Sequence, residues 1–408
     1  MSTAAGGVTI GVPRETLDAE TRVAMTPAAL TGLTKAGARV IIESGAGAAA
    51  GFTDDAYAEK GATVGAREAA LGADVVAVVR AVPRGGLENL RAGQVLVGMA
   101  TPFATPDAVA AFADRGVRLH ALELVPRTTR AQAMDVLSSQ ANIAGYKAVL
   151  LAAEALPKVF PLLTTAAGTI PPAKVFIVGA GVAGLSAIAT ARRLGAVVEA
   201  YDVRSAVKEE VQSLGARFVE LPLETGQQGE GSGAYAQQMS EETIRRQQDL
   251  MTKTVAASDV IITTAQVQGA KAPVIITEEM VRAMSPGAVI VDLAAEQGGN
   301  VAVTRAGETV DVGGVRVIGP VNVPGTVPAH SSLVYAKNVA NFLALMVKDG
   351  VLHDEVDDDI VRDSLVAHGG QVTSNRVREM LGLEPITPPA PPAQEPDDTD
   401  PPAEGSAG

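Results

Sequence analysis

Cysteine is absent from the 408 residues of the chain, and so is tryptophan. The absence of cysteine excludes disulfide scaffolds, thiolate zinc sites and cysteine nucleophiles, and it fits a reducing compartment. Histidine is scarce, and the spacing of the four residues forms no metal-ligand cluster; they are His120, His330, His353 and His368. We therefore expect no metal site.

Basic charge is also in short supply, because 33 lysine and arginine residues stand against 46 aspartate and glutamate residues. The net charge of −13 argues against a uniformly cationic nucleic-acid-binding protein, so we expect no nucleic-acid partner. Apolar stretches such as Ala73–Val79 and Val255–Ala265 fall short of the about 20 residues that a transmembrane helix needs, so we expect no membrane span. The start of the chain, Met1–Gly7, lacks the basic and apolar regions of a secretory signal.

The sequence does contain a globular composition, with 47% hydrophobic residues, and several short valine-rich runs. Unalternated runs of this kind are typical of parallel strands buried on both faces. Strands are predicted at Val8–Val12, Ala38–Ile42, Asp74–Val79, Val95–Met99, Lys174–Val178, Val197–Tyr201, Val260–Thr263, Val289–Asp292 and Val315–Ile318. Helices are predicted from Thr26, over Ala131–Ala155 as one long helix, and over Ser331–Val347. The fold class is α/β, with two Rossmann-like doubly wound parallel-sheet domains and a cleft between them.

A glycine-rich turn joins one of these strands to a helix, in the segment Gly179-Ala180-Gly181-Val182-Ala183-Gly184. This GxGxxG pattern carries weight because it follows a predicted strand and opens a predicted helix. The first glycine permits the tight turn, the second lets the backbone approach a pyrophosphate, and the third lets the helix pack closely. The helix N-terminus then offers N–H groups to the phosphates, so the turn predicts a dinucleotide site.

The next predicted strand ends at Asp202, followed by Val203 and Arg204. A carboxylate at this place accepts hydrogen bonds from the ribose hydroxyls and repels a 2′-phosphate, which favours NAD(H) over NADP(H). Arg204 leaves a 2′-phosphate open as an alternative. A glycine-rich turn without a ligand is the other alternative.

Five segments together carry a family resemblance: Ile10–Glu15, Thr21–Pro27, Val178–Leu185, Val291–Gly299 and Asn322–Pro328. From about residue 8 to about residue 347 the chain is similar to the alanine dehydrogenase and pyridine nucleotide transhydrogenase superfamily. The segment Pro126–Tyr146 resembles the NAD(H)-binding component of the transhydrogenases.

In that component an Arg-Gln-Asp loop reaches toward the nicotinamide end of the cofactor. The matching positions here are Arg127, Gln132 and Asp135, followed by Ser138. The resemblance implies that they position the cofactor, with Arg127 and Asp135 as an ion pair that sets the loop; a helix-start cap or a surface ion pair is the alternative for each. It also implies a mobile loop around Tyr235 that closes over the nucleotide. Thr264, Ala265 and Gln266, after a predicted strand, complete the expected cofactor contacts.

The resemblance implies proton-translocating transhydrogenation, in which hydride passes between NAD(H) on this chain and NADP(H) on a partner subunit. Membrane subunits would translocate the protons. The expected state is a homodimer in the cytoplasm, held peripherally at the inner (cytoplasmic) membrane by the membrane subunit and the NADP(H)-binding subunit. Hydride transfer between two nicotinamides requires oriented cofactors rather than a general acid, a general base or a metal in this component.

Two other functions remain open, an amino-acid dehydrogenase and a non-catalytic NAD-sensing module. A dehydrogenase of this superfamily needs a proton donor, and the resemblance places its histidine just after Val95–Met99, where this sequence has Ala100-Thr-Pro-Phe. Arg22 matches that branch's carboxylate-binding arginine. Arg80 stands where that branch has lysine, and Glu296 where it has aspartate.

The expected domain organisation follows from these motifs. Residues 1–140 form an N-terminal α/β domain, completed by C-terminal helices at about 325–383, and residues 141–324 form the Rossmann NAD(H)-binding domain. Residues 225–240, rich in glycine and glutamine, are a candidate mobile loop. Residues 384–408 are rich in proline and acidic residues, without lysine or arginine, and are expected to be a disordered tail.

Overall fold

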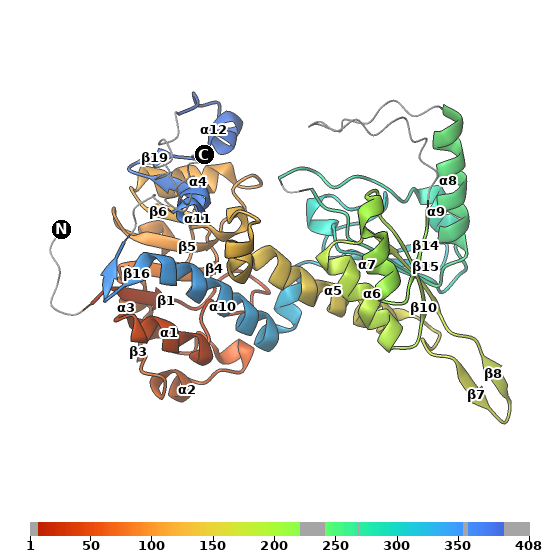
Figure 1. Cartoon of the computed structure of the whole chain (residues 1–408), viewed down its shortest axis with the longest axis horizontal. Helices are drawn as coiled ribbons and strands as arrows, with labels where there is room; N and C mark the ends of the chain where they lie inside the picture. The colour runs from red at the N-terminus through yellow and green to blue at the C-terminus, as the bar shows by residue number, and fades with distance from the viewer. Residues whose placement is uncertain (1–6, 221–240, 268, 354–357, 387–408) are drawn as a thin grey trace, which may run out of the picture.

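The computed structural model describes residues 7–220, 241–267, 269–353 and 358–386. The predictions for the loop 225–240, for Tyr235 and for the tail from residue 387 onward fall outside these residues. The chain forms two lobes, each built on one large sheet (Figure 1). We call the first sheet with its helices the first lobe, and the second sheet with its helices the second lobe.

The first sheet has eight strands in the order β19-β18-β6-β5-β4-β1-β2-β3. The strands are β1 (Thr9–Val12), β2 (Arg39–Glu43), β3 (Thr63–Gly65), β4 (Val75–Arg80), β5 (Val95–Met99), β6 (Arg118–Ala121), β18 (Leu365–His368) and β19 (Gln371–Val372). The pairs from β3 to β6 are parallel, whereas β18 runs antiparallel to both β6 and β19. The C-terminal region of the chain therefore completes the sheet that the N-terminal region begins.

The second sheet has seven strands in the order β11-β10-β9-β12-β13-β15-β14. They are β9 (Lys174–Val178), β10 (Val197–Tyr201), β11 (Arg217–Phe218), β12 (Val260–Thr263), β13 (Val289–Asp292), β14 (Thr309–Val312) and β15 (Val315–Ile318). Only the β14–β15 pair of this sheet is antiparallel. Small two-stranded ribbons are formed by β7 (Leu163–Thr165) with β8 (Gly168–Ile170) and by β16 (Val347–Lys348) with β17 (Val351–Leu352).

Helices cover these sheets on both sides. In the first lobe they are α1 (Leu30–Lys35), α2 (Asp54–Ala58), α3 (Arg67–Leu71), α4 (Pro106–Asp114), α10 (Pro328–Met346), α11 (Asp359–Ser364) and α12 (Asn375–Met380). In the second they are α6 (Val182–Arg193), α7 (Lys208–Ser213), α8 (Glu241–Ala256) and α9 (Glu278–Arg282), and α5 (Val136–Ala155) runs between the lobes. No helix in the described ranges combines the length and apolar character that spanning a membrane demands.

The α/β fold class with two such sheets is confirmed, and the predicted strands form with small shifts at their ends. Two expectations were wrong. The sheets are mixed rather than purely parallel, because β14, β18 and β19 run antiparallel at sheet edges. The helix predicted over Ala131–Ala155 begins only at Val136, because residues Thr129–Met134 form a 3-10 helix and Asp135 caps the α-helix that follows.

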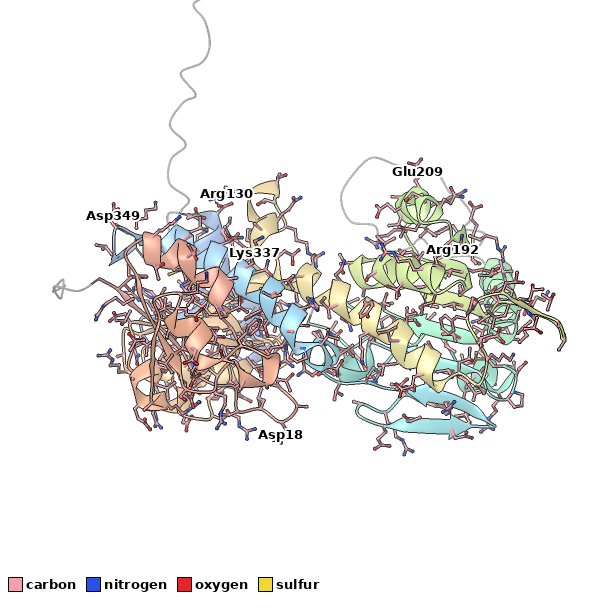
Figure 2. The ribbon with its side chains drawn as sticks, turned by 90° about the horizontal axis from the view of Figure 1, so that it is seen from below. Asp18, Arg130, Arg192, Glu209, Lys337 and Asp349 are labelled. Atoms are coloured by element: carbon pink, nitrogen blue, oxygen red, sulfur yellow. The ribbon has the colours of Figure 1, made fainter. Side chains whose placement is uncertain are left out.

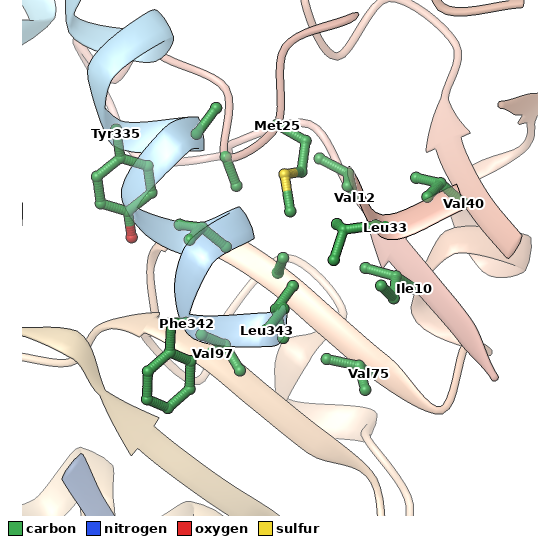
Figure 3. Close-up of a cluster of buried hydrophobic side chains, with 14 of the residues drawn as sticks. Ile10, Val12, Met25, Leu33, Val40, Val75, Val97, Tyr335, Phe342 and Leu343 are labelled. Carbon is green, nitrogen blue, oxygen red and sulfur yellow. The ribbon is translucent and has the colours of Figure 1, made fainter. Parts of the chain in front are cut away.

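Helix α10 returns from the second lobe and packs on the first sheet (Figure 3). Its Tyr335, Phe342 and Leu343 are fully buried against a core that includes Ile10 of β1 and Val97 of β5. Burial of each such side chain stabilises the fold by roughly 1.5–3 kcal/mol. This packing makes α10 a member of the first lobe, although it follows the second lobe in sequence.

The chain crosses between the lobes twice. The first crossing is α5, whose Val136 lies in the core of the first lobe and whose Ala148 and Val149 lie in the core of the second. The second crossing is residues 319–327, between β15 and α10. Figure 2 shows both from below, with Lys337 marking α10 on the first lobe and Arg192 marking α6 on the second.

Candidate functional site

The glycine turn lies between β9 and α6, as its sequence pattern predicts. Gly179 has φ +96°, and a Cβ built there would lie 2.6 Å from the hydroxyl of Thr264. A Cβ at Gly184 would lie 1.9 Å from the carbonyl oxygen of Gly179, so the helix packs directly on the turn. A Cβ at Gly181 would meet nothing within 4 Å, and this residue forms the N-cap of α6 without a side-chain capping bond. The turn thus has one open side, at the helix N-terminus.

Asp202 lies just after β10, beside this turn. One carboxylate oxygen accepts from the backbone N–H of Ala180 at 2.8 Å, and the other accepts from the backbone N–H of Arg204 at 2.8 Å. The Arg204 guanidinium also donates to both oxygens, at 3.0 and 3.1 Å. Burial alone would raise the pKa of Asp202, but the bonds from Arg204 and Ala180 outweigh burial and lower it. Asp202 is therefore a fixed anion, whereas Arg204 and Val203 are exposed.

The segment after β12 borders the same turn. Thr264 donates its hydroxyl to the carbonyl of Gly179 at 3.1 Å. Asn300 exchanges two hydrogen bonds with the backbone of Ala265, at 3.0 and 2.8 Å, and Gln266 donates to the carbonyl of Leu293 at 2.7 Å. The turn and this segment therefore form one connected edge of the second sheet.

A cleft of about 560 Å³ lies between the lobes. Both sheets contribute to it through segments that follow the carboxyl ends of their strands, where ligands bind in folds of this class. Its lining includes Arg22, Arg80, Thr101, Phe103 and Glu123 from the first lobe, Leu137, Gln140, Ala141 and Ala144 from α5, and Ala183, Thr264, Gln266, Lys271 and Glu296 from the second lobe. The predicted contacts Ala183, Thr264 and Gln266 are thus brought together in this cleft.

The four predicted nicotinamide-side residues lie at the start of α5, on the first lobe. Asp135 is the N-cap of α5, and its carboxylate accepts from the backbone N–H and the hydroxyl of Ser138, at 2.8 and 2.6 Å. The expected ion pair with Arg127 is wrong for this conformation, because among the described residues this carboxylate is engaged in the helix cap. Arg127 and Gln132 are exposed. None of the four appears in the lining of the 560 Å³ cleft.

Two charged groups of the first lobe border the cleft on its far side. Glu123 is deeply buried, and burial raises the pKa of its carboxyl although the backbone N–H groups of Ala100 and Thr101 donate to it. Arg80, at the end of β4, approaches Glu296 of the second lobe at 4.0 Å. The charges therefore face one another across the cleft.

Histidine takes no part in this cleft lining. His120 is buried in the first sheet at 3.0 Å from the hydroxyl of Ser364, and burial lowers its pKa to about 3, so its ring is neutral at pH 7. His330 is exposed on α10. In the described ranges of the chain no three His, Asp or Glu side chains gather as metal ligands.

Sequence reasoning missed two groups that organise the cleft. Asn300 holds the segment after β12 and also donates to the carbonyl of Pro273 at 2.8 Å; it directly follows the family-like segment Val291–Gly299, which was a usable signal. Arg376 of α12 stacks on Phe103, 4.0 Å from the ring centroid, and donates to the carbonyl of Gly269 at 3.1 Å. No sequence signal connects these three distant residues.

Comparisons with known proteins agree with this geometry. The alanine dehydrogenase/PNT N-terminal domain matches residues 11–144, and the alanine dehydrogenase/PNT C-terminal domain matches residues 148–375. The NAD(P) transhydrogenase subunit alpha of Cereibacter sphaeroides is 44% identical over 89% of this chain and 71% of its own. In Rhodospirillum rubrum the alpha subunit is divided, and the first of its polypeptides is 43% identical over 89% of this chain and 97% of its own.

Solved structures show the same relationship. A transhydrogenase from Sinorhizobium meliloti superposes with a TM-score of 0.82 at 43% identity, covering 89% of this chain and 99% of that one. An L-alanine dehydrogenase superposes with a TM-score of 0.78 at 26% identity, covering 92% and 99%. The resemblance predicted from the sequence is confirmed: the chain belongs to the alanine dehydrogenase/PNT family, on its transhydrogenase alpha-subunit branch.

Proposed function

We propose that the chain is the NAD(H)-binding subunit of a proton-translocating NAD(P) transhydrogenase. It exchanges hydride between NAD(H) in its own cleft and NADP(H) on a partner subunit, while membrane subunits translocate protons. The observation that carries the proposal is the 43% identity that spans 97% of the first alpha-subunit polypeptide of Rhodospirillum rubrum. The fold alone would not decide it, because alanine dehydrogenase shares the fold.

The second lobe binds the adenosine half of the cofactor. The open side of Gly181 admits the pyrophosphate to the N-terminus of α6, where its negative charge is favoured. Asp202 accepts from the ribose hydroxyls with lone pairs that Ala180 and Arg204 leave available. This carboxylate would repel a 2′-phosphate, which assigns NAD(H) to this chain and NADP(H) to the partner.

The first lobe positions the nicotinamide half. Gln132 offers both a donor and an acceptor to a carboxamide, and its exposure lets it move to the cofactor. Asp135 and Ser138 fix the start of α5 through the helix cap, and Arg127 and the loop around Tyr235 complete the enclosure. Bound NADH supplies the hydride itself, so these residues orient the ring and exclude water rather than transfer protons.

The proposal is tested by mixing the purified chain with the NADP(H)-binding component of a transhydrogenase and following hydride transfer from NADH to an NADP analogue. Transfer should require both components. NADH emission reports binding in the same sample without tryptophan background, because the chain has no tryptophan. Binding without transfer to a matched partner would favour an NAD-sensing module, and alanine-dependent NAD reduction without any partner would favour an amino-acid dehydrogenase.

A variant sharpens the role of the nicotinamide-side segment. Gln132→Asn shortens the side chain by one methylene and should slow hydride transfer strongly, while NADH affinity changes little. An unchanged transfer rate would remove Gln132 from the proposed site.

We also propose a homodimer within a membrane-associated complex. The β7–β8 ribbon projects from the second lobe (Figure 1), and its apolar residues Leu163 and Ile170 are 40% and 47% exposed. A second copy of the chain would cover them. The double variant Leu163→Asp/Ile170→Asp should sediment as a monomer and still bind NADH, and a dimer with both changes would contradict the role of the ribbon.

A further inference from the structure

Arg22 has an unusual position for an arginine that borders a cleft, because its side chain is only 2% exposed. It lies in the segment between β1 and the first helices of the first lobe. Its guanidinium is engaged with Glu20 through two bonds of 2.7 Å, from Nε to Oε1 and from Nη2 to Oε2. The Glu20 side chain is 1% exposed, so the pair is a buried, two-point ion pair.

The rest of the guanidinium reaches both crossings between the lobes. Nη1 donates to Oε1 of Gln140 on α5 at 2.7 Å, and Nη2 donates to Oδ1 of Asn322 in the second crossing at 3.1 Å. Asn322 in turn donates to the carbonyl of Ala19 at 2.9 Å and to Glu20 at 3.2 Å. We call Glu20, Arg22, Gln140 and Asn322 the crossing clamp.

The clamp is connected to the phosphate-binding turn through α5. A Cβ at Gly145 of α5 would lie 2.0 Å from the carbonyl oxygen of Ala183, in the first turn of α6. The hydroxyl of Ser186 on α6 donates to the carbonyl of Asn142 at 2.7 Å. The two helices are therefore in backbone contact, and a shift of α5 at Gln140 moves the glycine turn with it.

The second crossing is fixed equally firmly. Asn322 has φ +43° and ψ +46°, a left-handed conformation that asparagine tolerates and that its side-chain bonds hold in place. Its backbone N–H donates to Glu296 at 3.2 Å, and Glu296 faces Arg80 across the cleft. One guanidinium thus joins the first lobe, both crossings and the wall of the cleft.

We propose that Arg22 is a positioning residue for hydride transfer, setting the angle between the lobes through the crossing clamp. The inference rests on the proposed function, in which the second lobe holds the adenosine half of NAD(H) and the first lobe orients the nicotinamide half. The angle between the lobes then fixes the nicotinamide relative to the partner cofactor. Small displacements are costly in such a step, since about 1 Å can lower a rate by about a hundredfold.

Lysine is the informative substitution at this position. Its single ammonium cannot bind a carboxylate at two points and also reach two amides, whereas the positive charge is kept. Arg22→Lys should slow hydride transfer by about tenfold to a hundredfold. Its affinity for ADP-ribose, which occupies only the second lobe, should stay within about twofold of the parent.

A second variant guards against a failure to fold. Gln140→Met suits the helix and keeps the buried Glu20–Arg22 pair, yet it removes the bond between Arg22 and α5. It should slow transfer in the same way. Arg39→Lys is the matched control, because Arg39 is exposed on β2 of the same lobe and lies outside the cleft lining.

The angle itself can be measured without any activity. The parent has no cysteine, so Lys60→Cys and Ser213→Cys place one spin label on an exposed position of each lobe. The distribution of label distances, recorded with ADP-ribose bound, should be narrow in the parent and in Arg39→Lys, and broader or shifted in Arg22→Lys and Gln140→Met. Unchanged distributions in the folded clamp variants would overturn the proposal, and so would normal transfer rates. A parent that transfers no hydride to a matched partner would instead defeat the proposed function, and the distance arm would still decide the clamp.

Discussion

The two sheets direct their carboxyl edges toward the same cleft but fill their switch points differently. In the first sheet the strand order reverses between β1 and β4, where a Rossmann-type crevice is expected. The chain closes this crevice with its own carboxylate, since Glu15 accepts from the backbone N–H of Val79 at 2.6 Å and of Arg80 at 3.4 Å.

In the second sheet the reversal lies between β9 and β12, and the crevice stays open. The glycine turn leads directly into α6, and nothing lies within 4 Å of a Cβ built at Gly181. The two lobes thus share an architecture, yet only one retains a place for an anionic ligand. The difference shows that a few turn residues, rather than the doubly wound topology, decide which lobe binds the nucleotide.

The largest effect is expected from breaking the open crevice with Gly184→Ala. The added methyl would overlap the carbonyl oxygen of Gly179, 1.9 Å from the built Cβ. The variant should lose at least about 4 kcal/mol of unfolding free energy and all measurable NADH binding. Urea unfolding and NADH titration test this. Gly32→Ala, in an exposed turn of α1 with nothing within 4 Å, is the control and should be neutral or stabilising.

The closed crevice of the first lobe is probed through the titration of Glu15. Burial raises its pKa from 4.5 to about 7, against the lowering effect of the Val79 bond. The folded chain therefore holds this proton more tightly than the unfolded chain, and stability falls as pH rises from 4.5 to about 7. The expected loss is roughly 3 kcal/mol. Glu15→Gln should remove this component of the pH dependence, measured as unfolding free energy at pH 5, 6 and 7. Parallel pH profiles for the two proteins would contradict the assignment.

A smaller effect is expected at the ribose side of the open crevice. Asp202→Ser keeps an acceptor near the backbone of Ala180 but removes the charge and releases Arg204. NADH affinity should fall by about 2 kcal/mol, while NADPH affinity should rise because Arg204 can meet a 2′-phosphate. Titration of both nucleotides measures the change in preference. A preference for NADH that survives intact would place the ribose elsewhere.

The smallest effect on the fold is expected from Gly181→Ala. The residue has φ −79°, which alanine adopts readily, so the unfolding free energy should hold or rise slightly. The methyl would occupy the side from which the pyrophosphate approaches, and NADH affinity should fall about tenfold. Binding at the parental level would show that the phosphates do not touch this turn.

The sequence was sufficient for the features that depend on local patterns. Valine-rich runs identified the central strands, and the glycine spacing located the turn and the helix after it. The segment Thr129–Met134 was misjudged because its composition favours a helix, and only the Asp135–Ser138 cap separates its 3-10 turns from α5. The antiparallel edge strands β18 and β19 were missed because two to four residues carry little periodicity.

The contacts between the lobes were beyond sequence reasoning for a different reason. Arg22 was noticed as a single residue, but its partners Gln140 and Asn322 are 118 and 300 positions away. The pairing of Asp202 with Arg204 also changed the picture, because two residues considered as rivals for nucleotide preference hold each other. Such partnerships depend on the tertiary fold, and one sequence does not reveal them.

The return of α10 to the first sheet has a consequence for synthesis of the protein. The first lobe is begun by residues near the N-terminus, but its core includes Tyr335 and Phe342, and its sheet is finished by β18 and β19. A ribosome therefore completes every strand of the second sheet before it releases the helix that covers β1 and β5. The half of the molecule that is translated first is the half that finishes folding last, and its valine-rich strands depend on the cell's chaperones during that interval.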